Sequence, residues 1–159
     1  MIGRKKYTAA KIALILPSAG DARKALDVAL KYLAPDGELW IVQTPGGLVP
    51  SAVSTWMIYL GFMGDRPSGD YMEIAMEEYR SRVQERLDDL TSIAHDRKVE
   101  CSPVMLEGKT EDAVLEWVQE HQPDGIVVLR PEIIDPEREL FIKLADLLEK
   151  RFSVKLYRV

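Results

Sequence analysis

The residues best suited to binding chemistry stand where strands are expected to end. Arg130 directly follows the apolar run 126–129, and Ser18 and Gly20 come just after the apolar run 12–16. In open α/β sheets, ligands usually bind in the crevice beside the carboxyl ends of such strands. An arginine there, together with backbone N–H groups at the start of a helix, could hold a small anion.

Two further residues extend this group. Gln43 ends the second apolar run and Gly108 follows the third, so the candidate ligand-binding residues are Ser18, Gly20, Gln43, Gly108 and Arg130. The alternative for the arginine is an ion pair within its own loop, because arginines readily find acidic partners. Glu132 and Asp135 are the carboxylates available for that pairing.

Catalytic and metal-binding signatures are missing from the sequence. It contains no Gly-x-Ser-x-Gly elbow, Walker loop, His-Glu-x-x-His motif or Gly-x-Gly-x-x-Gly fingerprint. His95 and His121 lie near the expected ends of two helices, where the helix dipole favours them. An enzyme would have to rely on Asp21, Glu107 or Glu132, and no base–nucleophile pair is visible among them. We therefore expect a non-enzyme with no metal and no cofactor.

The composition is typical of one globular domain. The chain has 159 residues, of which 47% are hydrophobic and 30% charged, and its net charge is −5. An acidic balance argues against nucleic-acid binding, which needs a basic surface. Cys101 is the single cysteine, so no disulfide forms within the chain, which fits a reducing compartment. We expect a cytoplasmic protein without a membrane span, with residues 1–10 as an N-terminal arm and 11–159 as the domain.

Hydrophobic patterning predicts strands that alternate with helices. Continuous apolar runs are typical of central parallel strands, and the intervening three- and four-residue spacing is typical of helices packed on a sheet. Pro103 places the third strand at an edge, and the alternating pattern at 152–159 places the last strand at the other edge. We expect a three-layer, doubly wound, Rossmann-like α/β fold with five parallel strands.

Three local features accompany this prediction. We expect the turn 35–37 to end the first helix, and Thr110 to cap a later helix. A long helix over about 70–94 is expected to turn its charged face, which includes Arg86, toward solvent.

A hydrophobic insertion at 46–69 separates the second strand from that long helix. Its central part, 48–63, is about two-thirds apolar and too short to cross a bilayer of about 30 Å. It could be a lid that completes the core, or a partner surface. A membrane-surface role is disfavoured because the lysines and arginines of an interfacial helix are lacking. The candidate partner residues are Trp56, Tyr59, Phe62 and Met63.

This element order resembles that of the universal stress protein family over roughly residues 10–159. The segment 124–128 is similar to the Asp-x-Ile-Val-Val strand that precedes the family's nucleotide loop, and 106–108 is similar to its strand–Gly–helix junction. The run 154–157 stands where the family has its hydrophobic C-terminal strand. The resemblance implies strand order 3-2-1-4-5, in agreement with an edge position for the third strand.

The sequence departs from the nucleotide-binding members of that family. They carry Gly-x-x-Gly after the fourth strand and Gly-Ser or Gly-Thr further on, whereas 129–137 contains no glycine here. Pro131 and Pro136 lack N–H donors, and the neighbouring acidic side chains would repel phosphate. Pro17 replaces the family's acidic residue at the end of the first strand. We therefore expect that this chain does not bind ATP.

The resemblance implies a non-enzymatic stress-response domain that acts through homodimerisation and protein contacts. By family analogy, the terminal strand 153–159 pairs with its twin across a two-fold axis. The candidate interface residues are Val154, Leu156 and Tyr157. The alternative is a small-anion or nucleotide-binding regulatory protein that uses the crevice at the carboxyl ends of the first and fourth strands.

Overall fold

The fold was obtained as a computed structural model, which describes residues 9–18, 20–45, 69–132 and 137–159. Strands and helices alternate along the chain, as the patterning predicts. The elements are β1 (Ala9–Leu16), α1 (Ala22–Tyr32), β2 (Leu33–Gln43), α3 (Gly69–Asp96), β3 (Glu100–Met105), α4 (Thr110–His121), β4 (Gly125–Val128), α5 (Arg138–Arg151) and β5 (Lys155–Arg158).

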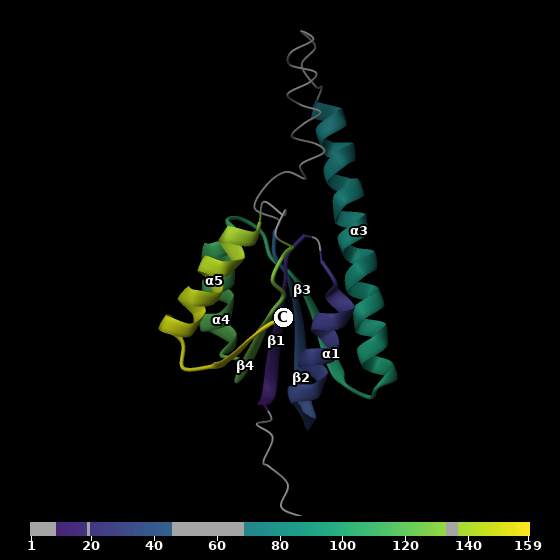
Figure 1. The fold of residues 1–159 in the computed structure, drawn as a ribbon. Coiled ribbons are helices and arrows are strands. Elements are labelled where there is room, and N and C mark those ends of the chain that lie inside the picture. Colours follow the sequence, from purple (N-terminus) through teal and green to yellow (C-terminus); the bar gives the residue numbers. More distant parts are fainter. Residues whose placement is uncertain (1–8, 19, 46–68, 133–136) are drawn as a thin grey trace, which may run out of the picture.

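The strands form one sheet between two layers of helices. Its order is β3-β2-β1-β4-β5 and every neighbouring pair is parallel, which confirms the predicted fold class and strand order. Helices α1 and α3 cover one face, and α4 and α5 cover the other (Figure 1). Because β1 and β4 are covered on both faces, their side chains are almost entirely buried.

Alternate residues of β1 supply two separate cores. Ile12, Leu14 and Leu16 pack with α1 and α3, whereas Ala13 and Ile15 pack with α4 and α5. All five side chains are fully buried. The central strand is therefore held from both faces, which fixes the position of its carboxyl end.

The two edge strands lie where the sequence places them. Pro103 lies in β3, whose only neighbour in the sheet is β2, so its missing N–H interrupts no ladder on the outer side. At the other edge, Tyr157 of β5 stacks on Tyr32 of α1 with ring centroids 3.9 Å apart. Arg158 makes ion pairs with Asp146 and Glu149, and both of these carboxylates belong to α5.

Two local predictions are wrong. The turn 35–37 lies inside β2 instead of ending α1, because the helix stops at Tyr32 and the strand starts at the next residue. Gly37 permits this path, since a Cβ at that position would lie 2.6 Å from Leu33 Cδ1. Thr110 is not the cap of α4. Lys109 takes that position in an extended conformation, and the Thr110 side chain is buried at the start of the helix.

Several predictions fall on residues outside the described ranges. These are most of the N-terminal arm and nearly all of the hydrophobic insertion, with its four candidate partner residues. They stay predictions, as does the division into an arm and one domain. Within the described helices, no segment has both the length and the apolar character that a membrane span requires.

Candidate functional site

The carboxyl ends of β1 and β2 are joined by a hydrogen-bond network centred on Arg86 of α3. The Arg86 Nη1 atom donates to Pro17 O at 2.7 Å and to the Gln43 Oε1 atom at 3.0 Å, and Ser18 O lies 3.4 Å away. One guanidinium nitrogen thus connects a helix, the turn after β1 and the last residue of β2. We call this set, together with Thr44, the Arg86 network.

Gln43 and Thr44 complete this network from the β2 side. The Gln43 Nε2 atom lies 3.1 Å from Pro17 O and 3.4 Å from Leu16 O, and Thr44 Oγ1 donates to Leu16 O at 2.8 Å. Both side chains are fully buried. A buried amide with several partners is usually a structural group, because leaving it unpaired would be costly.

Arg86 is the charged member of the network. Burial lowers the pKa of its guanidinium, while the nearby Tyr79 and Glu137 act in the opposite direction. The Arg86 Nη2 atom and the Tyr79 hydroxyl are buried without a hydrogen-bond partner among the described groups. Most buried polar atoms of the network therefore have a hydrogen-bond partner, but these two do not.

Ser18 connects the turn after β1 to the opposite layer of the fold. Its backbone N–H donates to the Glu137 Oε1 atom at 3.2 Å, and Glu137 occupies the cap position of α5. The turn is consequently held by α3 on one side and by α5 on the other.

Two hollows flank the Arg86 network along the same edge of the sheet. The first lies beside the ends of β1 and β4, at the topological switch point where the strand order reverses, and we call it the switch hollow. Its volume is about 610 Å³. Its lining residues are Gly20, Asp21, Lys24, Leu129, Arg130, Pro131, Glu132, Arg138 and Val159. None of the ion pairs among the described residues includes Lys24, Arg130 or Arg138.

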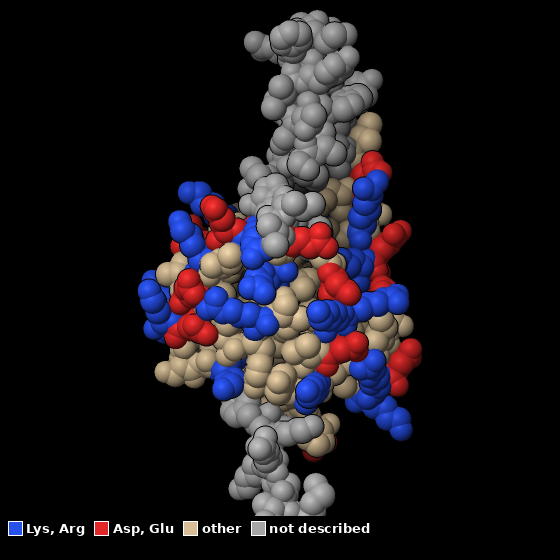
Figure 2. Space-filling view, viewed as in Figure 1, with Lys and Arg blue, Asp and Glu red and all other residues tan. Residues whose placement is uncertain are grey.

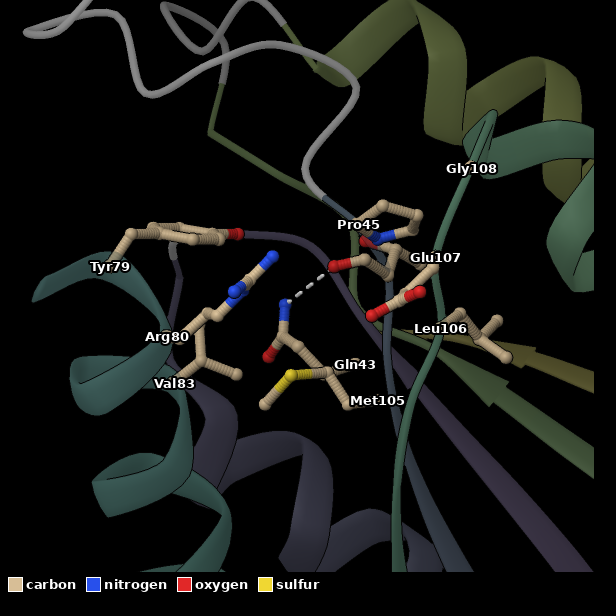
Figure 3. A pocket seen from close by; sticks show the side chains of 10 residues that line it. Gln43, Pro45, Tyr79, Arg80, Val83, Met105, Leu106, Glu107 and Gly108 are labelled. Carbon is tan, nitrogen blue, oxygen red and sulfur yellow. Dashed lines mark hydrogen bonds between the residues drawn. The ribbon is translucent and has the colours of Figure 1, made fainter. Parts of the chain in front are cut away.

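The second hollow, which we call the edge hollow, lies between α3 and the ends of β2 and β3 (Figure 3). Its volume is about 300 Å³. The lining residues are Gln43, Thr44, Pro45, Tyr79, Arg80, Val83, Met105, Leu106, Glu107 and Gly108. Figure 3 shows Arg80 entering it from the helix and Glu107 from the turn after β3.

The structure separates the five predicted ligand-binding residues. Gly20 and Arg130 line the switch hollow, Gln43 and Gly108 line the edge hollow, and Ser18 lies in the turn after β1. The helix start near Ser18 and Gly20 is also less suited to an anion than the sequence suggests. Helix α1 starts at Ala22, and the Asp21 carboxylate before it already accepts the Lys24 N–H at 3.1 Å.

Arg86 was not among the predicted site residues. The sequence pattern assigns it to the solvent face of α3, whereas the structure buries much of its side chain against the turn after β1. The missed signal is its spacing: Arg86 stands three residues after Val83 and four before Leu90, both of which are buried. That spacing puts it on the border of the inward face.

Of three comparisons with known proteins, the one with solved structures found matches, and these agree with this architecture. No protein-family model matches the sequence, and no curated protein matches it. Among solved structures, a protein of the universal stress protein family from Burkholderia pseudomallei matches with a TM-score of 0.56 and 19% identity, covering 99% of this chain and 98% of that one. The chain has the universal stress protein fold.

Two further universal stress proteins match over nearly their whole length. UspA from Lactobacillus plantarum has a TM-score of 0.55 at 10% identity, covering 98% of this chain and 99% of that one. A universal stress protein solved in complex with cAMP has a TM-score of 0.49 at 16% identity, with 96% and 97% covered. These identities bear on the fold alone.

The charged surface and the titratable groups narrow the chemistry that this universal-stress-protein-like domain can perform. On the face shown in Figure 2, basic and acidic side chains are interspersed, so no extended field of one sign is seen there. No group of three or more histidine, cysteine or carboxylate side chains that could hold a metal ion occurs among the described residues. Burial raises the pKa of the Cys101 thiol to about 11, which disfavours the thiolate needed for nucleophilic attack.

Proposed function

We propose that this chain is a non-enzymatic, universal-stress-protein-like domain that acts through homodimerisation and protein contacts and does not hold ATP. The observation that carries this proposal is the free edge of β5. Among the described strands it pairs with β4 alone, so one side of its backbone is available to another chain.

The register identifies which backbone groups are available for dimer pairing. The Val159 N–H donates to Val128 O and its carbonyl accepts from the Arg130 N–H, so both groups of Val159 face β4. Because these directions alternate along a strand, the N–H groups of Leu156 and Arg158 face the open edge. An antiparallel copy of β5 could therefore pair there without disturbing the existing sheet.

One feature of the sequence supports the second half of the proposal, that the chain does not hold ATP. The sequence after β4 has prolines and carboxylates in place of a glycine-rich loop. A triphosphate would find few free N–H donors beside such groups.

Static light scattering on the whole chain at micromolar concentration tests the dimer. We expect twice the mass of one chain for the wild type and for Arg158→Ala, which loses its ion pairs but keeps the outward N–H. Arg158→Pro loses the same ion pairs and the N–H, so we expect it to be monomeric. A monomeric wild type would contradict the proposal, as would an Arg158→Pro variant that dimerises as strongly as Arg158→Ala.

Titration calorimetry with ATP tests the other half. We expect no binding heat up to millimolar ATP. A dissociation constant in the micromolar range would show that the turn after β4 accommodates a triphosphate despite its sequence.

A second candidate function is binding of a small anion in the switch hollow. It is favoured by the three cationic side chains there, from Lys24, Arg130 and Arg138, which make no ion pair with another described residue. Thermal shift with inorganic phosphate, sulfate and AMP separates it from the first candidate. A ligand concentration of about a hundred times the dissociation constant would raise the free energy of unfolding by about 2.7 kcal/mol.

A further inference from the structure

The edge hollow differs from the switch hollow in position and in chemistry. It lies under the N-terminal half of α3, at the ends of the outermost strand pair β2 and β3 (Figure 3). The central crevice of the fold, between β1 and β4, is on the other side of the Arg86 network. A ligand of the edge hollow therefore need not resemble a nucleotide.

The base of the edge hollow is fixed by hydrogen bonds. Gln43 pairs in register with Met105, and the Leu106 N–H donates to Gln43 O at 3.0 Å. The Gln43 side chain is held in turn by Arg86 and by the carbonyls of the turn after β1. Since both strands and the amide are anchored, the hollow is preformed rather than dependent on a rearrangement.

Two opposite charges enter the hollow from different elements. Arg80 comes from α3 and Glu107 from the turn after β3 (Figure 3). No salt bridge between them, or from either to another side chain, is recorded within the described parts of the chain. A cation and a carboxylate that line one hollow without pairing are complementary to a ligand that carries both charges.

The remaining wall is apolar. Val83 is buried beneath the hollow, while the Met105 side chain is 40% exposed. Pro45 and the Tyr79 ring add further apolar surface. Methionine adapts its shape readily to apolar groups of different form, which suits a wall that contacts a side chain of the ligand.

We propose that the edge hollow binds a small zwitterion, namely a free amino acid with an apolar side chain. The ligand carboxylate pairs with Arg80, its ammonium group pairs with Glu107, and its side chain lies against Val83 and Met105. The volume of about 300 Å³ is at the lower end of the range of small-molecule sites, which fits an amino acid.

Titration calorimetry with three matched probes tests the charge requirement. L-leucine carries both charges, 4-methylpentanoate carries only the carboxylate, and 3-methylbutylamine carries only the amine. We expect measurable binding of L-leucine. The dissociation constant of each singly charged probe should be at least about tenfold higher, because each probe loses one charge-assisted contact.

Two variants assign the contacts. Arg80→Gln is expected to weaken L-leucine binding by about tenfold while leaving 3-methylbutylamine unchanged, and Glu107→Gln is expected to do the same for L-leucine while leaving 4-methylpentanoate unchanged. Arg151→Gln and Glu116→Gln change the same charges at exposed positions on other helices and serve as controls. Thermal unfolding of each variant checks that it is folded.

Three results would overturn the proposal. These are absence of heat with L-leucine, L-methionine and L-phenylalanine up to about 10 mM, equal affinity for L-leucine and 4-methylpentanoate, or equal effects of the site variants and their controls. None depends on whether the chain dimerises or binds ATP, so this proposal and the proposed function can fail separately.

Discussion

The Arg86 network and the switch hollow lie along the same edge of one sheet, but their charged groups are used differently. In the network, a partly buried arginine donates to Pro17 O and to the buried Gln43 side chain. In the switch hollow, Arg130 is exposed and makes no ion pair with another described residue. Both are arginines near the carboxyl end of a central strand.

The difference shows that position at a strand end does not by itself make an arginine a ligand-binding group. The Arg86 side chain extends from α3, and its guanidinium donates to Pro17 O and to the Gln43 side chain, so its charge stabilises the fold. Arg130 follows β4, its backbone N–H donates to Val159 O, and its side chain is exposed, so its charge is available. Stability and ligand binding should therefore separate when the two are substituted.

The largest expected effect is on stability at Arg86. Arg86→Met keeps most of the aliphatic length but removes the donor to Pro17 O and Gln43, so we expect the free energy of unfolding to fall by about 2 kcal/mol in urea denaturation. Arg82→Met, on the same helix, removes only an exposed ion pair with Glu78 and should cost less than about 0.5 kcal/mol. Equal losses would mean that the network contributes no more than a surface pair.

Next in size is the turn that separates the two regions. Gly20 has φ +122°, and a Cβ there would lie 3.0 Å from Leu129 Cδ2, so Gly20→Ala should lose about 1 kcal/mol of stability. Gly108→Ala also places alanine at positive φ, but nothing lies within 4 Å of its Cβ, so its loss should be smaller. Adding Leu129→Ala isolates the contact, because the double variant should lose less than the sum of its parts.

At Arg130 we expect almost no effect on stability. Arg130→Gln should change the free energy of unfolding by less than about 0.5 kcal/mol, because its side chain is exposed and makes no ion pair with a described residue. If the switch hollow holds a small anion, the same variant should abolish the rise in melting temperature caused by phosphate or sulfate. A large loss of stability at Arg130 would remove the contrast with Arg86.

Cys101 lies outside both regions and shows what ordinary burial does to a titratable group. Burial raises its pKa to about 11. A pKa above the unfolded value of about 8.5 means that the thiol's contribution is complete below that pH and is lost as pH rises toward 11. Urea denaturation across this window should therefore show a steeper decline for the wild type than for Cys101→Ala.

The fold could be predicted from sequence because its signals are local and consistent. Continuous apolar runs indicated the buried strands, and Pro103 placed β3 at an edge because a proline cannot donate to a ladder. Helix boundaries were less certain. A proline, an aspartate and a glycine at 35–37 usually end a helix, but here the tight packing around Gly37 places them inside β2.

The site could be predicted only in part, because it depends on the reach of long side chains. Gln43 and Gly108 were correctly assigned to the carboxyl edge of the sheet, yet they lie in a different hollow from Gly20 and Arg130. Arg86 was assigned to solvent, since a helical pattern gives the direction of a Cβ but not the end point of a flexible arginine. The contact between α3 and β1 spans almost 70 residues of sequence, which no local pattern reveals.

The start of β2 has a consequence for how the length of this chain can vary. Ala9 pairs with Leu33 and Lys11 with Glu38, so β2 advances by more residues than β1 between these two points. Residues 34–37 therefore form a bulge that takes up the excess before the regular ladder starts. Single-residue deletions or additions at Pro35 or Asp36, with Gly37 kept, should leave the alignment of 39–43 and the placement of Gln43 unaltered, which makes this bulge the natural position for inserting a peptide tag.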